Sequence, residues 1–66
     1  MQITINGELK QIAVNTTVDA LINQLGIDKR KIAVELNLSV LPRSQFATRI
    51  LAEGDNIEMV NFVGGG

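Results

Sequence analysis

The residues best suited to chemistry are the last three of the printed sequence, Gly64, Gly65 and Gly66. Glycine has no side chain and adopts backbone angles closed to other residues, so this segment can enter a channel too narrow for any other residue. The sequence contains no cysteine and no histidine, which excludes thiolate ligands and the most common general base. We therefore predict that the Gly66 carboxylate is the functional group, that Gly64 and Gly65 enter the active sites of partner proteins, and that the chain has neither a catalytic residue nor a metal site. The alternative is an inert, disordered chain end.

Length and composition indicate one small folded domain. The chain has 66 residues, of which 45% are hydrophobic and 20% charged, a balance typical of compact domains and unlike that of disordered chains. The net charge is −1 and residues 29–31 form the only basic cluster, which argues against a nucleic-acid partner because such proteins need a broader basic face. No apolar run approaches the roughly 20 residues that cross a bilayer, and the N-terminus lacks the basic start of a signal peptide. We expect a cytoplasmic monomer with no membrane partner.

The first 14 residues have the pattern of a β-hairpin. Ile3 and Ile5 alternate with polar residues, which is the period of a half-buried strand. The Asn6-Gly7 dipeptide suits the positive backbone angles of a two-residue hairpin turn. The alternation continues through Ile12 and Val14, so we expect these four isoleucine and valine side chains to face the same side of a sheet.

A short helix is predicted from about residue 17 to residue 25. Either Thr16, with Asp19 three residues on, or Thr17 can cap its N-terminus. Gly26 suits the position just past a helix end, where a left-handed backbone conformation is common. The hydrophobic residues of one helical face are Val18, Leu21, Ile22 and Leu25.

The second half of the chain predicts two strands joined by loops. The first covers 32–36 with Val34 and Leu36 facing inward, and 37–39 form a turn. Pro42 can begin one helical turn, and 48–51 could hold a short edge strand. The last strand covers 57–63 and is substantially apolar on both faces, which indicates a central position in the sheet. One face of this strand carries Ile57, Met59 and Asn61, and the other carries Glu58, Val60 and Phe62.

These elements predict an α+β fold of the β-grasp type, with a mixed sheet and one main helix packed on one face. The last strand should lie beside the first, because that position buries it under the helix. We expect residues 1–63 to form the domain and residues 64–66 to form a flexible tail.

The sheet face away from the helix is a candidate docking surface. If Val60 and Phe62 point outward, they form an apolar patch beside the tail, and Glu58 shares their face. The alternative is that loop residues such as Val40 or Leu41 cover them as ordinary core. Three further charged residues could contact a partner or could be ordinary solvated residues of a loop, and we favour the loop interpretation. They are Arg43, Glu53 and Asp55.

The chain resembles the bacterial sulfur carrier proteins of thiamine thiazole synthesis, a ubiquitin-like family, over essentially its full length. The segments that carry the resemblance are Met1-Gln2-Ile3, Asn6-Gly7, Thr17-Val18 with Leu21, Asn37, Val40-Leu41-Pro42-Arg43 with Phe46, Glu53-Gly54-Asp55 and Gly65-Gly66. The sequence departs from the family pattern at Gly64, where alanine is frequent, and at Phe46, where tryptophan is common.

The resemblance implies a protein co-substrate and not an enzyme. An adenylating enzyme of the ubiquitin-activating type would use ATP to adenylate the Gly66 carboxylate, and a persulfide donor system would convert it to a thiocarboxylate. Thiazole synthase would then consume the sulfur, and the chain itself would bind no cofactor. The alternatives are the sulfur-carrying small subunit of molybdopterin synthase, a carrier for tRNA thiolation, or a ubiquitin-like interaction domain with an inert tail.

Overall fold

The computed structural model describes residues 1–62. Its regular elements in chain order are β1 (Gln2–Ile5), β2 (Glu8–Gln11), α1 (Val18–Gln24), the 3-10 helix η1 (Lys29–Lys31), β3 (Ile32–Leu36), β4 (Ser39–Leu41), the 3-10 helix η2 (Arg43–Gln45) and β5 (Asn56–Asn61).

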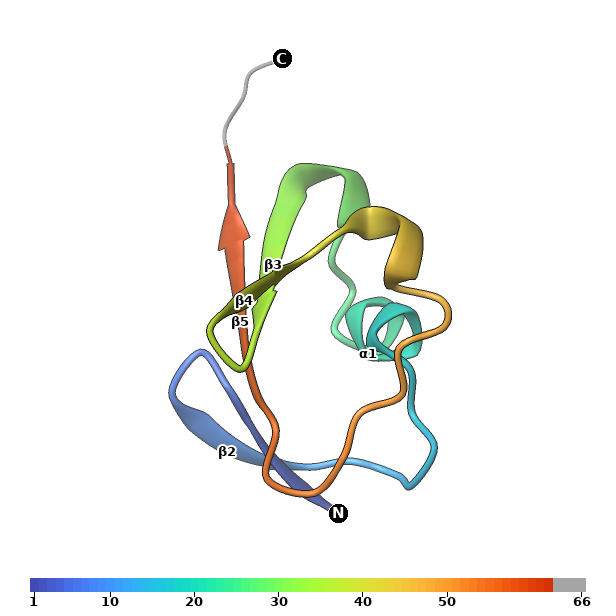
Figure 1. Cartoon of the computed structure of the whole chain (residues 1–66), viewed down its shortest axis with the longest axis vertical. Coiled ribbons are helices and arrows are strands. Elements are labelled where there is room, and N and C mark those ends of the chain that lie inside the picture. Colours follow the sequence, from blue (N-terminus) through green and yellow to red (C-terminus); the bar gives the residue numbers. More distant parts are fainter. Residues whose placement is uncertain (63–66) are drawn as a thin grey trace.

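The five strands form one mixed sheet in the order β2-β1-β5-β3-β4. β5 runs parallel to β1 and antiparallel to β3, and the other pairs are antiparallel. Helix α1 and the 42–52 segment lie on the same side of this sheet (Figure 1). The predicted α+β fold, with a mixed sheet, a central last strand and one main helix on one face, is therefore confirmed.

The N-terminal hairpin turns where the sequence predicts, but its second strand is shorter than expected. Asn6 and Gly7 have the positive φ angles of the predicted turn, 49° and 85°. β2 ends at Gln11, and Ile12 is only partly buried against the core. The inward prediction for Val14 is wrong, because the chain turns away from the sheet at Asn15 (φ 70°) and leaves the Val14 side chain 71% exposed.

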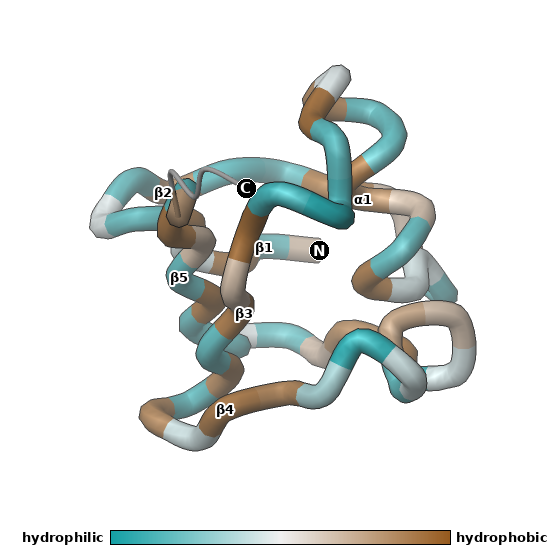
Figure 2. Tube along the Cα trace, turned by 90° about the horizontal axis from the view of Figure 1, so that it is seen from above, coloured by the Kyte–Doolittle hydropathy of each residue, from teal (hydrophilic) through white to brown (hydrophobic). Residues whose placement is uncertain are grey.

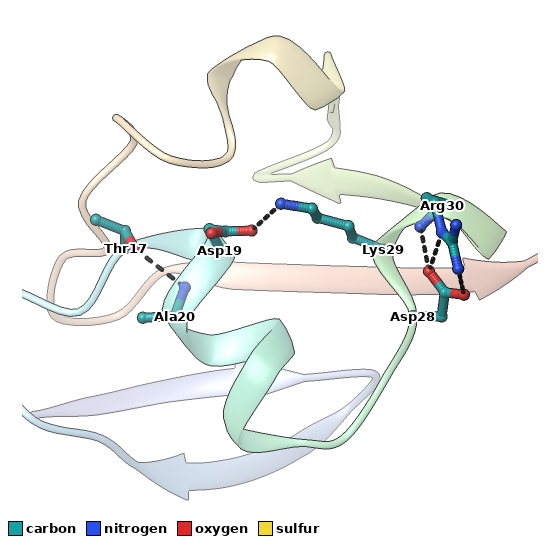
Figure 3. Close-up of polar contacts among 6 residues, drawn as sticks. All are labelled: Thr17, Asp19, Ala20, Asp28, Lys29 and Arg30. Carbon is teal, nitrogen blue, oxygen red and sulfur yellow. Dashed lines mark hydrogen bonds and ion pairs between the residues drawn. The ribbon is translucent and has the colours of Figure 1, made fainter.

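Helix α1 begins with the second of the two predicted caps. The hydroxyl of Thr17 accepts a hydrogen bond of 3.0 Å from the amide of Ala20 (Figure 3). Thr16 is instead buried and donates its hydroxyl proton to the carbonyl of Ala13. Gly26 has the left-handed conformation expected past the helix end, with φ 71°.

The loops of the second half contain one strand that the sequence analysis missed. The turn after β3 is confined to Asn37 and Leu38, which have φ angles of 52° and 71°. Ser39, predicted in the turn, instead begins β4, which pairs with β3. The segment predicted as a possible edge strand forms only one bridge, between Thr17 and Ile50.

The core lies between the sheet and the layer made by α1 and the 42–52 segment. Side chains from β1, β3 and β5 alternate into this layer, as expected for strands with one buried face. Val34 and Leu36 are among them, as predicted. The buried hydrophobic residues are Ile3, Ile5, Val18, Leu21, Ile22, Ile32, Val34, Leu36, Leu41, Phe46, Leu51, Ile57 and Met59.

Two asparagine side chains hold the backbone of the central strand. Asn6 donates from Nδ2 to the Met59 carbonyl (3.3 Å) and accepts from the Met59 amide at Oδ1 (2.8 Å). Asn37 accepts from the Asn56 amide (2.9 Å) and donates to Asp55 (3.0 Å). A side-chain amide offers both a donor and an acceptor. Asn6 therefore binds the backbone of β5 just past the end of β1, and Asn37 does so just past the end of β3.

The loop between α1 and β3 is organised by ion pairs. Asp28 accepts two side-chain hydrogen bonds of 3.0 Å from Arg30, and Lys29 contacts Asp19 at 3.0 Å (Figure 3). The side-chain hydrogen bonding of Arg30, followed by that of its backbone amide, lowers the pKa of the Asp28 carboxyl from 3.8 to about 2. The same pairing raises the pKa of Arg30.

Replacing Asn6 by glycine should destabilise the fold by about 1–2 kcal/mol, because glycine accepts the positive φ but removes two hydrogen bonds to Met59. Urea unfolding measures the change. Asn15→Gly is the matched control: Asn15 also has a positive φ but makes no side-chain hydrogen bond within the described chain. Equal stability for the two variants would show that the Asn6 amide contributes nothing.

The Asp28 carboxyl should titrate near pH 2 in the folded protein, and Arg30→Gln should return its pKa toward 3.8. Because the folded pKa is below the unfolded one, the stabilisation by this pair is present above about pH 4. It is lost as the pH falls toward 2. Carboxyl NMR titration of both proteins tests this, and an unchanged midpoint in the variant would contradict the assigned cause.

Candidate functional site

The predicted reactive segment begins just beyond the described part of the chain. Gly64, Gly65 and Gly66 lie outside the described residues, as does Val63. Their predicted roles, and the predicted boundary between a 1–63 domain and a tail, stay predictions. The structure describes the surface from which the segment leaves, which is the end of β5 and the sheet face around it.

The end of β5 is held by its neighbours up to the last described residue. The amide of Phe62 donates to the carbonyl of Lys31 at 3.0 Å, one pair beyond the last ladder pair between Ile32 and Asn61. On the other side, the Asn6 amide binds Met59. The end of β5 lies at the opposite end of the molecule from the N-terminus (Figure 1). Hydrogen bonds on both sides therefore fix the position and direction of the strand that precedes residues 63–66.

The sheet face opposite the core is exposed around this strand. Val60 is 60% exposed and Phe62 is 48% exposed, which confirms that both side chains reach solvent. Val40, which could have covered them, is itself 73% exposed, and Leu41 is buried in the core. Figure 2 shows hydrophobic residues along β4 and an alternation of hydrophobic and hydrophilic residues along β5. The docking role of Glu58, Val60 and Phe62 stays a prediction.

The register of the sheet adds a residue to this face that the sequence analysis did not select. Glu35 lies directly opposite Glu58 on the neighbouring strand, and Val40 lies opposite Glu35 on its other side. The inward prediction for Val34 and Leu36 already implied that Glu35 points outward. Its position beside Glu58 follows only from the pairing of β3 with β5, which no local pattern reveals.

Asp55 and Glu53 have structural contacts. Asp55 is 8% exposed and accepts hydrogen bonds from the Ala52 amide (2.7 Å) and from Asn37. Glu53 accepts a hydrogen bond from the amide of Gln2 at 3.0 Å. The prediction that these residues are solvated is wrong for Asp55. Its carboxylate is buried, and it accepts hydrogen bonds from the Ala52 and Asn37 amides just before β5 begins.

Arg43 is the first residue of η2, and its side chain reaches η1. Its Nη2 is 3.4 Å from the carbonyl oxygen of Arg30. This contact joins η2, which follows β4, to η1, which precedes β3. Lys31 of η1 also accepts, at its carbonyl oxygen, the hydrogen bond from the Phe62 amide. The sequence favoured an arginine that stiffens its own loop, but the contact found for Arg43 is with a different element, η1. A partner contact for this residue stays a prediction.

Neither a metal centre nor a membrane span is found in the part of the chain that the structure describes. Residues 1–62 contain no group of three or more acidic side chains arranged to hold a metal ion. Over the same residues, no helix has the length and hydropathy needed to cross a bilayer.

Comparison with known proteins gives consistent matches over the whole chain. The family model described as the ThiS family matches residues 3–66. The Escherichia coli protein named sulfur carrier protein ThiS is 35% identical over 66 residues, which cover all of both chains. A crystal structure of ThiS from Geobacter metallireducens superposes with a TM-score of 0.86 at 33% identity and covers all of both chains.

A longer relative has a different name. A protein of Paramagnetospirillum magneticum named thiazole synthase is 46% identical over 66 residues, and this chain spans only 20% of its length. The family match, the full-length relative and the structural match nevertheless agree with one another and with the β-grasp sheet. The chain belongs to the ThiS family of sulfur carrier proteins.

Proposed function

We propose that this chain carries sulfur as a thiocarboxylate on Gly66 and supplies it for the thiazole ring of thiamine. The observation that carries the proposal is the family match, which continues through the glycines to residue 66. An activating enzyme forms the acyl-adenylate from the Gly66 carboxylate and ATP, with release of pyrophosphate. A persulfide then displaces AMP, and cleavage of the resulting S–S bond by a thiol leaves the sulfur on Gly66.

The chemistry of the carboxylate decides which steps the partner enzymes must catalyse. A carboxylate is a poor electrophile, and adenylation supplies the leaving group that it lacks. The sequence has no histidine or cysteine to act as base or nucleophile, so the chemistry falls to the partner enzymes and the chain is their co-substrate. We expect these reactions in the cytoplasm.

The partners must approach the body of the domain closely. Four residues follow Phe62, and four residues span at most about 14 Å even when fully extended. An active site that holds the Gly66 carboxyl therefore lies within about this distance of the end of β5. A surface around that strand is the region that a partner meets first.

Thiazole synthase is the proposed acceptor. Its support is that proteins of this name from Paramagnetospirillum magneticum and Magnetococcus marinus contain a stretch 46% and 41% identical to this chain. Molybdopterin synthase and tRNA thiolation would use the same thiocarboxylate with another acceptor. An inert interaction domain would never acquire sulfur.

Mass spectrometry tests the sulfur step directly. The protein is incubated with the adenylating enzyme, ATP and a persulfide donor, and the expected product gains the mass of oxygen replaced by sulfur. The product is then offered to thiazole synthase and, separately, to molybdopterin precursor. Persistent absence of the sulfur adduct would support the inert domain, and transfer only to the molybdopterin precursor would support that alternative.

Adding one residue after Gly66 should abolish activation, because the acyl group would move about 3.5 Å past the adenylation site. The melting temperature should stay unchanged. ATP–pyrophosphate exchange measures the activation step, with the unextended protein as the control. Full exchange by the extended chain, without trimming, would contradict the requirement for a terminal glycine carboxylate.

Gly65→Leu should lower the rate of adenylation about 10²-fold, because a side chain displaces the reacting carboxyl in a narrow channel. Thermal unfolding of the variant should match wild type. Turnover comparable to wild type would remove the steric reason for the glycine segment.

A further inference from the structure

The hairpin turn between β1 and β2 contains two neighbouring residues that can react with each other. Asn6 is followed directly by Gly7, and both are exposed to solvent. The backbone nitrogen that follows an asparagine can attack the carbon of the side-chain amide, and asparagine is accordingly a thermolabile residue. Glycine has no side chain to hinder this attack. The turn therefore holds a nucleophile and an electrophile that the proposed sulfur chemistry does not use.

Asn6 is the only asparagine in the sequence that precedes a glycine. Each of the others precedes a residue whose side chain hinders the approach of the backbone nitrogen, and these are Asn15, Asn23, Asn37, Asn56 and Asn61. The space around Gly7 is open as well. An atom at the position of a Cβ on this glycine would meet no atom within 4 Å other than those of its chain neighbours. Steric access therefore distinguishes position 6 from the other asparagines.

The contact with β5 opposes the reaction. Asn6 donates from Nδ2 to the Met59 carbonyl (3.3 Å) and accepts at Oδ1 from the Met59 amide (2.8 Å). Attack on Cγ requires the Asn6 side chain to turn back toward its own peptide bond. Both terminal atoms of the side chain are bound to the neighbouring strand, so the side chain has to leave Met59 before it can react.

We propose that Asn6-Gly7 is a site of spontaneous covalent modification, at which Asn6 is converted to aspartate and isoaspartate at a rate set by the opening of its contact with Met59. The inference does not depend on the proposed function.

The reaction needs only water and hydroxide. Hydroxide removes the proton of the Gly7 amide, and the nitrogen forms a bond to Cγ of Asn6. The Cγ–Nδ2 bond breaks, and Nδ2 takes a proton from water and leaves as ammonia, so that a cyclic succinimide remains and hydroxide is regenerated. Water then adds to one of the two succinimide carbonyl carbons and opens the ring. One opening gives aspartate, and the other gives isoaspartate, in which the main chain continues through the former side chain.

Either product weakens the hold of the turn on β5. An aspartate at position 6 can still accept from the Met59 amide, but it no longer donates to the Met59 carbonyl, and its carboxylate lies beside that oxygen. Isoaspartate also lengthens the backbone of a two-residue turn, whose geometry is matched to the two strands. The ladder between β1 and β5 covers only two residue pairs, so the loss affects the strand that leads to residues 63–66.

The test incubates the folded protein in mildly alkaline buffer and follows its intact mass. Conversion replaces an amide NH2 by a hydroxyl, peptide mapping places the change, and a carboxyl methyltransferase specific for isoaspartate identifies that product. The same protein in urea gives the rate for the unfolded chain. Conversion of Asn6 should be roughly 10- to 30-fold slower in the folded protein, because two hydrogen bonds must first open. The rate should rise with pH, because the nucleophile is the deprotonated nitrogen.

Leu38→Gly is the matched control for the role of the glycine. It creates a second Asn-Gly pair in the turn between β3 and β4, where Asn37 also binds the β5 backbone through the Asn56 amide. Leu38 has a φ of 71°, which glycine adopts readily, so the variant should fold. Asn37 should stay unmodified in wild type and should be converted in the variant. Conversion of Asn37 in wild type at the rate of Asn6 would show that glycine does not select the site.

Asn6→Asp reproduces one product and tests its effect on β5. The Met59 amide should exchange with solvent about 10-fold faster in this variant, and unfolding should need less urea, because one hydrogen bond is lost. Asn15→Asp is the control, because it adds the same charge at another exposed asparagine with a positive φ. It should leave the exchange of the Met59 amide unchanged.

Three results would overturn the inference. The first is a folded protein that stays unmodified after the unfolded chain has been converted completely. The second is an equal rate for the folded and unfolded chains, which would exclude control by the contact with Met59. The third is an Asn6→Asp variant in which the Met59 amide exchanges as in wild type. None of these measurements involves sulfur, so the inference and the proposed function are tested separately.

Discussion

The hydrogen bonding of β5 is the constraint on which the rest of the molecule depends. This strand is last in the sequence but central in the sheet, between the parallel β1 and the antiparallel β3. Its ladder with β1 covers only two residue pairs, and the Asn6 side chain extends the contact to Met59. A small domain gains much of its core from one such strand, because Ile57 and Met59 are buried under the helix.

A central position for β5 also divides the sheet into two faces with different roles. The inner face packs against α1 and the 42–52 segment and supplies the core. The outer face leaves Val40 and Val60 in solvent and sets two glutamates against each other. Arrangements that cost stability in the isolated protein are expected where a surface has a partner. The fold thus supplies a core on one side of the sheet and an exposed face on the other, beside the end of β5.

In the proposed function, the partner enzymes supply the catalytic groups and this chain supplies the carboxylate that they modify. In that proposal, separate enzymes adenylate the Gly66 carboxylate, convert it to a thiocarboxylate and remove the sulfur, and each of them has to recognise the same domain. Near the end of β5, the Arg43 side chain of η2 contacts the Arg30 carbonyl of η1. Because four residues span at most about 14 Å, the proposed reactions at Gly66 require each partner enzyme to approach the end of β5.

Local patterns in the sequence determined most of the regular elements and are the basis of the proposed chemistry at Gly66. Alternation identified β1, β3 and β5, and the spacing of Val18, Leu21 and Ile22 identified α1. The absence of histidine and cysteine, together with the three glycines at 64–66, predicted a functional carboxylate in place of a catalytic side chain. Tertiary structure decided what depends on pairing between distant residues. β4 and the exposure of Val14 depend on where the chain turns, through the positive φ angles of Leu38 and Asn15, which local hydrophobic alternation does not encode. The burial of Asp55 and the opposition of Glu35 to Glu58 depend on register, because a strand pattern shows which face a side chain occupies but not which side chain it meets.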